Sequence, residues 1–232
     1  MRRFVFCFLI LIFVSEGLMS AELASQPNDG DGTVLSTRED GQAGSGAFDV
    51  LAADDFVVPS GQTWSVAALD FCCGFVDCRT KRANQNGFNI FIFEDAGGLP
   101  GAVLHEFLQL QPAQEGINLA YPVLLSEGHY WIGIQYHFEG DDLTCGGHLP
   151  LSAVQTNHPF AWRTGDYGAF GCSDWNTGMV CNPDGTSPDL SFALYDTPFR
   201  AAVPALGPVG LIVLAGLLVG VGLVIRRPSG NV

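Results

Sequence analysis

The stretch GFNIFIFEDAGGLPGAVLHEFLQL (87–110) decides the fold class. Its first part, 87–94, is apolar on both faces, which is typical of a central strand in a β-sandwich. Residues 95–101 (DAGGLPG) are dense in turn residues, since glycine accepts positive φ and Pro100 fixes φ. A second strand-like run follows over 102–110. The stretch therefore predicts a β-hairpin inside a sheet.

Similar strand signals recur on both sides of this hairpin, separated by turn residues. In chain order they cover 47–58, 63–71, 121–125, 129–138 and 189–196. Pro59-Ser60-Gly61 predicts a turn between the first two, and Ser126-Glu127-Gly128 separates the next two. In the last segment, Leu190, Phe192 and Leu194 are expected to point inward. Roughly eight to ten strands without an internal repeat predict an all-β fold, a two-sheet antiparallel sandwich of jelly-roll type.

The composition is acidic and poor in the residues that build long helices. The chain has 24 Asp and Glu residues against ten Lys and Arg residues, a formal net charge of −14. Four of the basic residues lie in the two apolar ends, so the middle of the chain is more acidic still. Such a surface repels phosphate backbones, which disfavours nucleic-acid binding.

The N-terminal segment has the layout of a secretory signal peptide. A basic start (MRR) precedes an apolar run over 4–14 that is too short to span a bilayer. Ser20 and Ala21 offer small residues for cleavage. We therefore predict a signal peptide over 1–20, with an uncleaved membrane anchor as the alternative.

The C-terminal segment is an apolar run closed by two arginines. Residues 205–225 carry no charge and would span about 31 Å as a helix, close to the ~30 Å hydrocarbon core of a bilayer. Arg226 and Arg227 should stop the span on the cytoplasmic side. We predict a transmembrane helix over 205–225 and a basic cytoplasmic tail over 226–232. A buried hairpin of strands is the alternative.

The same end resembles a sorting signal. An apolar–Pro–small–Leu tetrad, an apolar helix and a basic end are similar to the C-terminal sorting signals of Gram-negative bacteria, the PEP-CTERM and IPTL-CTERM group. The tetrad consists of Val203, Pro204, Ala205 and Leu206. The resemblance implies a membrane-held precursor and a sorting or processing machinery as partner. A permanent single-span anchor is the alternative.

Most of 47–196 shows a second resemblance. The segments ADDF (53–56), IFEDAGGLPGAVL (92–104), LSEGHYWIGI (125–134) and DLSFAL (189–194) are similar to a β-sandwich module common in secreted bacterial proteins with such tails. This resemblance implies the fold and an exported location, and it brings no catalytic residues with it.

Three further segments complete the predicted domain organisation. Residues 21–46 are rich in Gly, Asp and Ser, and their NDGDGT does not align with an EF-hand calcium loop. We predict a flexible, solvated segment there, with one plausible strand over TVLST (33–37). The β-sandwich domain then covers 47–198, and 199–204 is a linker that contains the start of the tetrad.

The seven cysteines point to disulfide bonds. Cys7 is removed with the predicted signal peptide, which leaves an even number of cysteines. In an exported protein these cysteines meet an oxidising compartment, where disulfides form. The remaining residues form two groups, Cys72, Cys73 and Cys78, then Cys145, Cys172 and Cys181. Cys172 and Cys181 flank a short loop and can close it. The alternative for 72–78 is a metal knot, although CCGFVDC lacks the paired C-x₂-C spacing of zinc sites.

The sequence contains neither a G-x-S-x-G nor an H-E-x-x-H motif. Its five histidines are His105, His129, His137, His148 and His158, and none has a recognisable ligand spacing. His129 and His137 fall on one strand face with Trp131 and Gln135, which a half-exposed sheet face explains. We predict no catalytic residue, cofactor or metal ligand.

The segment 139–188 reads as a long loop region rich in aromatic residues. Trp162, Tyr167 and Trp175 lie in it, and aromatic rings on disulfide-pinned loops can stack on sugar rings. The alternative is that the two tryptophans cap the core. A structural Ca²⁺ could take oxygens from Asp141, Asp142, Asp184 and Asp189, for which solvated loop acids are the simpler interpretation.

These features predict an exported, non-enzymatic cell-surface or extracellular-matrix protein that is sorted or tethered by its C-terminal signal. The first alternative is a carbohydrate-binding module that uses the loop aromatics on an extracellular polysaccharide. The second is a secreted hydrolase. In each case we expect the protein in the cell envelope, at the surface or outside the cell.

Overall fold

The computed structural model describes residues 20–40, 49–71, 85–113, 116–139, 148–165, 172–181 and 188–199. This part of the chain is all-β apart from one helical turn, as predicted. The elements are β1 (Glu22–Gln26), β2 (Thr33–Leu35), β3 (Thr37–Asp40), β4 (Val50–Asp70), β5 (Gln85–Asp95), β6 (Pro100–Leu110), β7 (Ile117–Glu139), β8 (His148–Ser152), β9 (Ala161–Thr164), β10 (Asn176–Thr177), α1 (Gly178–Cys181), β11 (Asp189–Leu190) and β12 (Phe192–Tyr195).

The predicted signal peptide up to residue 19, the linker from residue 200, the sorting tetrad and the predicted transmembrane helix lie outside the described residues. Within the described residues, no helix is long and apolar enough to cross a membrane.

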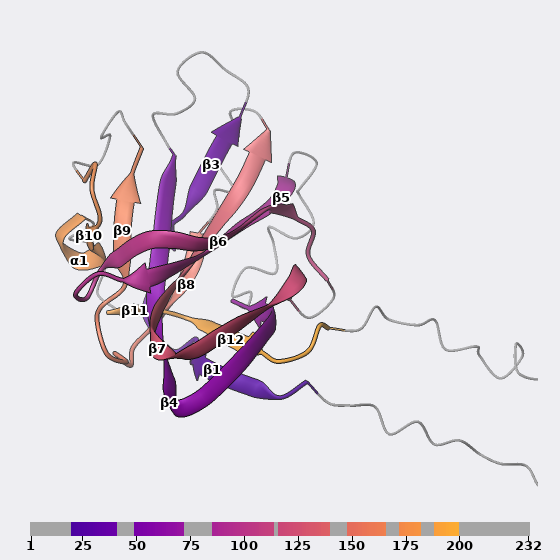
Figure 1. Cartoon of the computed structure of the whole chain (residues 1–232). Helices are drawn as coiled ribbons and strands as arrows, with labels where there is room; N and C mark the ends of the chain where they lie inside the picture. Colours follow the sequence, from indigo (N-terminus) through magenta and orange to yellow (C-terminus); the bar gives the residue numbers. More distant parts are fainter. Residues whose placement is uncertain are drawn as a thin grey trace, which may run out of the picture. The chain divides into compact units, whose positions relative to one another are not determined.

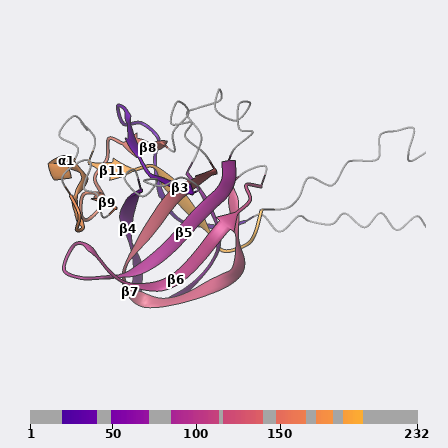
Figure 2. The same ribbon diagram turned by 90° about the horizontal axis from the view of Figure 1, so that it is seen from above.

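The predicted hairpin is confirmed. β5 pairs antiparallel with β6 on one side and with β7 on the other, so it is a central strand (Figure 2). In the connecting turn, the Ala96 amide donates to the Leu99 carbonyl at 2.9 Å. Gly97 and Gly98 both have positive φ, which explains why the turn carries glycine at these positions.

Two predicted turns are absent, because β4 and β7 are each one long strand. They pair antiparallel with each other along most of their length. The turn expected at 59–61 is instead a bulge, since Val58 pairs with Gly128 and Thr63 pairs with Ser126. Figure 1 shows β4 as one continuous ribbon that curves sharply at its lower end.

A single carboxylate holds the bulge. Glu127 Oε2 accepts hydrogen bonds from the Ser60 hydroxyl at 2.9 Å and from the Gly61 amide at 2.5 Å. Gly61 has a φ of 76°, a left-handed conformation that disfavours other residues. The turn residues of the sequence are therefore used to bend a strand.

The strands form two hydrogen-bonded sheets. The larger has nine strands, with a main order β1-β12-β4-β3-β7-β5-β6, while β9 and β10 extend it beside β4. The smaller has the order β11-β8-β2. Nearly all pairings are antiparallel, and β3 with β7 is a parallel one. The predicted last strand is split at Ser191 between the two sheets, and its three inward residues, Leu190, Phe192 and Leu194, are buried as expected.

The described part of the segment 21–46, residues 21–40, is not the flexible segment that its composition indicates. It contains β1, β2 and β3, which pair with β12, β8, β4 and β7. Val34 and Ser36 are fully buried. Likewise, 139–188 contains β8, β9, β10 and α1 rather than a continuous loop. Long-range strand pairing overrides the local turn composition in both places.

The first part of β4, residues 50–56, buries both of its faces. The even-numbered residues of this part, such as Ala52 and Phe56, enter the large core between the sheets. Its odd-numbered residues Leu51 and Ala53 pack with Phe93, Trp131 and Ala161 in a second, smaller cluster. Because side chains alternate along a strand, consecutive residues of β4 reach different environments.

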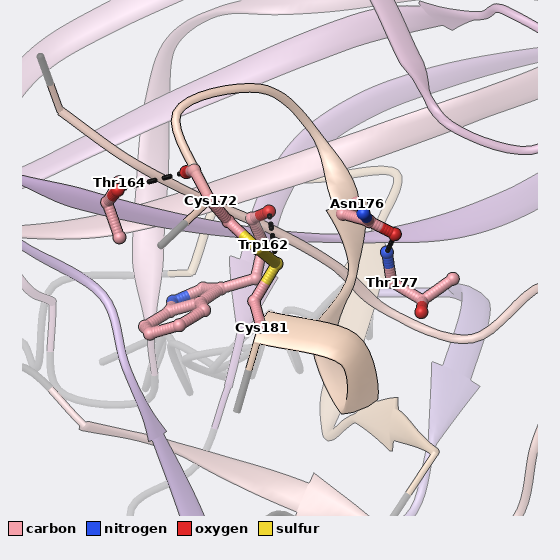
Figure 3. The surroundings of a disulfide bond; sticks show 6 residues. All are labelled: Trp162, Thr164, Cys172, Asn176, Thr177 and Cys181. Atoms are coloured by element: carbon pink, nitrogen blue, oxygen red, sulfur yellow. Dashed lines mark hydrogen bonds between the residues drawn. A yellow bond between two sulfur atoms is a disulfide. The ribbon is translucent and has the colours of Figure 1, made fainter. Parts of the chain in front are cut away.

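The predicted disulfide between Cys172 and Cys181 is present (Figure 3). It closes a short loop against β9, where the Thr164 amide and hydroxyl donate to the Cys172 carbonyl at 2.7 and 2.9 Å. The loop also packs tightly against Phe160, because a Cβ on Gly178 would lie 1.9 Å from the Phe160 ring. The other four cysteines of the predicted framework lie outside the described residues.

Candidate functional site

Two adjacent aspartates lie in the buried first part of β4. Asp54 and Asp55 are both fully buried. The alternation of the strand sends Asp54 toward the large core and Asp55 toward the smaller cluster. A buried carboxylate is costly unless it is paired or hydrogen-bonded, so the partners of each aspartate define the site.

Asp55 meets His129 across the β4–β7 pair. Asp55 lies opposite Trp131 and His129 lies opposite Val57, so the two polar residues are diagonal neighbours on one face. His129 Nε2 lies 2.5 Å from Asp55 Oδ2.

His158 reaches the same carboxylate from the connection between β8 and β9. Its backbone amide donates to Asp55 Oδ2 at 3.1 Å, and its Nδ1 lies 3.0 Å from that oxygen. Asn157, just before it, has a φ of 66°, a conformation that asparagine tolerates better than most residues. This kink lets the amide and the ring of His158 face one acceptor.

The two imidazole rings and Trp131 are stacked. The ring centroids of His129 and His158 are 5.1 Å apart with planes 20° apart, and those of His129 and Trp131 are 6.2 Å apart. Trp131 is fully buried, whereas the side chains of His129 and His158 are 22% and 46% exposed. The cluster is therefore closed on the Trp131 side and open to solvent at the histidines.

Asp95, at the end of β5, stands behind His129. Its Oδ1 lies 3.7 Å from His129 Nδ1 and accepts hydrogen bonds from Trp131 Nε1 at 2.9 Å and from the Gly98 amide at 3.0 Å. Burial acts to raise the pKa of Asp95. The two hydrogen bonds, a third from the Gly97 amide and the nearby charge of His129 outweigh burial, so the pKa is lowered. The predicted turn 95–101 thus holds an ionised carboxylate behind the imidazole.

Asp54 has a second buried acid, Asp189, as its neighbour. Burial, followed by the charge of Asp189, raises the pKa of Asp54 well above its ordinary value. Burial also raises the pKa of Asp189 to about 7, helped by the charge of Asp55 and opposed by the hydrogen bond from the Thr156 amide. Asp54 accepts from the Leu190 amide at 2.5 Å. The protein therefore favours a protonated carboxyl in this pair.

The arrangement offers three metal-ligand atoms in one place. One atom each from Asp55, His129 and His158 all lie within 4.8 Å of one another. Asp55 Oδ1 is buried and has no hydrogen-bond partner. Imidazole and carboxylate are the donors that several divalent transition metals accept.

The aromatic residues predicted to bind a ligand are placed differently. Trp162 is 2% exposed and belongs to the large core, so its ring is not available to a ligand, in line with the alternative that it caps the core. Trp175 is half-buried between the edge of Phe93 and the guanidinium of Arg163, which lies 4.7 Å from the ring centroid. Tyr167 lies outside the described residues.

Other polar residues also differ from their predicted settings. The β7 face with His129, Trp131, Gln135 and His137 is mostly buried rather than half-exposed. Asp189 is a buried acid and not a solvated one. The remaining acids of the calcium hypothesis, Asp141, Asp142 and Asp184, lie outside the described residues.

The site formed by Asp55, His129 and His158 was not predicted from the sequence. One local signal could have indicated it, namely the pair Asp54-Asp55 inside the apolar run VLAADDFVV. Acids seldom occupy both faces of a buried strand unless they have partners. The histidines themselves are far away in the sequence and carry no such signal.

None of the protein-family models, curated proteins or solved structures compared with this chain matches it.

Proposed function

We propose that this chain is an exported, non-enzymatic cell-surface or extracellular-matrix protein built on an antiparallel β-sandwich of jelly-roll type. The observation that carries the proposal is the Cys172–Cys181 disulfide, in a domain flanked by two apolar ends. Disulfides persist in oxidising compartments and are rare in the cytosol.

The start of the fold supports removal of a signal peptide near residue 20. β1 begins at Glu22, and the Ala21 nitrogen donates to Asp196 Oδ1 at 2.8 Å. Cleavage between Ser20 and Ala21 would turn this nitrogen into the terminal ammonium group. The hydrogen bond to the carboxylate would then join two opposite charges and become stronger.

The long strands support the sandwich of jelly-roll type. β4 and β7 bend at the bulge, and the chain passes from the smaller to the larger sheet at Ser191. Bulges and strands that change sheet are the means by which sandwiches make their corners. The lack of G-x-S-x-G and H-E-x-x-H motifs in the sequence supports a non-enzymatic role.

The tetrad Val203-Pro204-Ala205-Leu206, the apolar run and the two arginines support sorting through the inner membrane. Pro204 and Pro208 favour an extended segment before the span, because each lacks an amide hydrogen and disfavours helix in the preceding residue. A processing machinery and the membrane are the partners in this proposal.

The test is the intact mass of the protein recovered from its native host without reduction. We expect a chain that begins at Ala21, contains the Cys172–Cys181 disulfide and has lost the C-terminal span. Replacing Pro204 and Leu206 by Ala should abolish the C-terminal loss, whereas Pro208→Ala, outside the tetrad, should not.

Two results contradict the proposal separately. A chain that retains residues 1–20 and free thiols at both cysteines contradicts export. A chain that is exported but still ends in Arg226, Arg227 and the tail contradicts sorting and leaves a permanent membrane anchor.

A further inference from the structure

We infer that Asp55, His129 and His158 bind one Zn²⁺ ion, through a carboxylate oxygen, Nε2 and Nδ1 respectively. This inference concerns the smaller cluster of the fold and is independent of how the protein is exported. It assigns a binding role to residues that the proposed function does not use.

The ligand atoms are close to the spacing that zinc requires. Zinc lies about 2.0–2.2 Å from nitrogen and oxygen ligands, so ligand atoms in a tetrahedral site are roughly 3.3 Å apart. Asp55 Oδ2 is 2.5 Å from His129 Nε2 and 3.0 Å from His158 Nδ1, and all three lie within 4.8 Å. To admit the ion, the two partly exposed imidazole rings would have to move away from Asp55 Oδ2 until these distances reach about 3.3 Å.

A carboxylate lies beside the outer nitrogen of His129. If Nε2 binds the ion, Nδ1 carries the proton and faces Asp95 Oδ1, 3.7 Å away, which is an ion-pair distance and longer than a hydrogen bond. Zinc-binding histidines usually donate this proton to a carboxylate, which fixes the ring and makes its other nitrogen a better donor. Asp95 is itself held by Trp131 Nε1 and by the Gly98 amide, so the outer shell rests on rigid elements.

His158 is positioned by two neighbours. Its own backbone amide is bound to Asp55 Oδ2, and its ring packs closely on the β5–β6 turn. A Cβ on Gly98 would lie 2.8 Å from His158 Cδ2 and 2.9 Å from Nε2. The turn therefore blocks the Nε2 side and leaves Nδ1 pointing at the other ligands.

Charge also favours a cation here. Asp55 is fully buried, and its Oδ1 has no hydrogen-bond partner. A divalent ion would supply the positive charge that buried carboxylates need. Two imidazoles and one carboxylate suit zinc, whereas Ca²⁺ and Mg²⁺ prefer oxygen ligands. The solvent-exposed side of the histidines leaves room for water as the fourth ligand.

The test uses the full-length protein, treated with EDTA, dialysed and titrated calorimetrically with ZnCl₂, CaCl₂ and MgCl₂ in parallel. We expect one equivalent of Zn²⁺ to bind, and no binding of the other two at the same concentrations. At a Zn²⁺ concentration a hundredfold above its Kd, the Tm should rise by roughly 5–10 °C.

Variants separate this site from other zinc-binding groups of the chain. Loss of a residue that only supports a zinc ligand weakens zinc binding by roughly 10–100-fold, and we expect a loss in this range for Asp95→Asn. His158→Ala and His129→Ala each remove a ligand and should weaken zinc binding by more than that. His105→Ala, a histidine of β6 outside the cluster, is the matched control and should bind as the wild type does.

Histidine variants are chosen because both rings are partly exposed, whereas Asp55→Asn perturbs a fully buried strand position. The inference is overturned if the wild type binds no stoichiometric Zn²⁺. It is also overturned if both histidine variants bind Zn²⁺ with wild-type affinity. In either case the cluster is a hydrogen-bond network only. The histidine variants would then have a lower Tm than the wild type, and added zinc would not change it.

Discussion

The two halves of the β4–β7 ribbon use the same backbone pairing but are stabilised differently. In the apolar half, residues 63–69 of β4 pair with 117–126 of β7, and the buried side chains, such as Leu69 and Val123, are hydrocarbon. In the polar half, residues 52–58 pair with 128–134, and the strand buries Asp54 and Asp55. Apolar burial stabilises the first half directly, while the second depends on partners for each carboxylate.

The difference teaches where a function can be built on this fold. Hydrophobic burial has no directional requirement, so the apolar half needs only well-fitting side chains. Buried acids require particular donors at particular places, and the polar half obtains them from β7, from the β8–β9 connection and from β11. The histidine nitrogens that we assign to zinc are among the groups that the buried Asp55 needs as partners.

The largest effect is expected in the apolar half. Leu69→Ala removes a fully buried side chain of the large core and should lower the free energy of unfolding by about 2–5 kcal/mol. Leu124→Ala, in the same half but 71% exposed, should change it by no more than about 0.5 kcal/mol. Urea denaturation of both variants checks this, and equal losses would contradict the division into buried and exposed faces.

The next effect concerns the cover of the polar half. β9 pairs with Val50–Ala53, and the disulfide loop is bonded to β9 through Thr164. Replacing Cys172 and Cys181 together by Ala should cost about 2–3 kcal/mol, the value expected for a loop of this length. Hydrogen exchange should accelerate at the Thr164 amide and not at Leu125 in the apolar half. Uniform acceleration would mean that the two halves unfold as one unit.

The pH dependence of stability should come from the polar half. Asp189 has a pKa of about 7 in the folded state against 3.8 ordinarily, so between these values the folded protein binds more protons than the unfolded one. Stability should therefore fall as pH rises through this window, by up to about 1.4 kcal/mol per pH unit. Below pH 3.8 this contribution no longer changes, because the carboxyl is protonated in both states.

Asp189→Asn should flatten that slope, which denaturation midpoints measured between pH 5 and about 7.5 would show. Leu69→Ala is the control, because it should lower stability at every pH without changing the slope. A wild-type slope in the Asn variant would mean that Asp189 is not the group that titrates.

The smallest effect distinguishes two neighbouring glycines of the β5–β6 turn. Gly97→Ala places a Cβ in open space, so its cost is backbone strain alone, on the order of 1 kcal/mol. Gly98→Ala adds a clash with the His158 ring and should shift the His158 resonances in an NMR spectrum, while Gly97→Ala should not. Identical His158 shifts in both variants would contradict the packing of this turn on the site.

The sequence by itself determined the all-β class and the hairpin over 87–110, and it indicated that Cys172 and Cys181 could form a disulfide. These features depend on local chemistry. Alternating apolar residues favour strands, glycine permits the conformations of a tight turn, and two cysteines close in the sequence can meet without help from the rest of the chain.

Only the tertiary structure decided the rest. Pro59-Ser60-Gly61 can end a strand or bend it, and the pairing with β7 selected the bend. Residues 21–40 have the composition of a solvated segment, but their strands β1 and β2 pair with β12 and β8. The three residues of the candidate zinc site come from a strand, its partner strand and a loop, namely Asp55, His129 and His158. No local sequence pattern predicts that they lie close together. Register and topology bring them to one point, because a side chain's neighbours across a sheet are set by pairing and not by sequence distance.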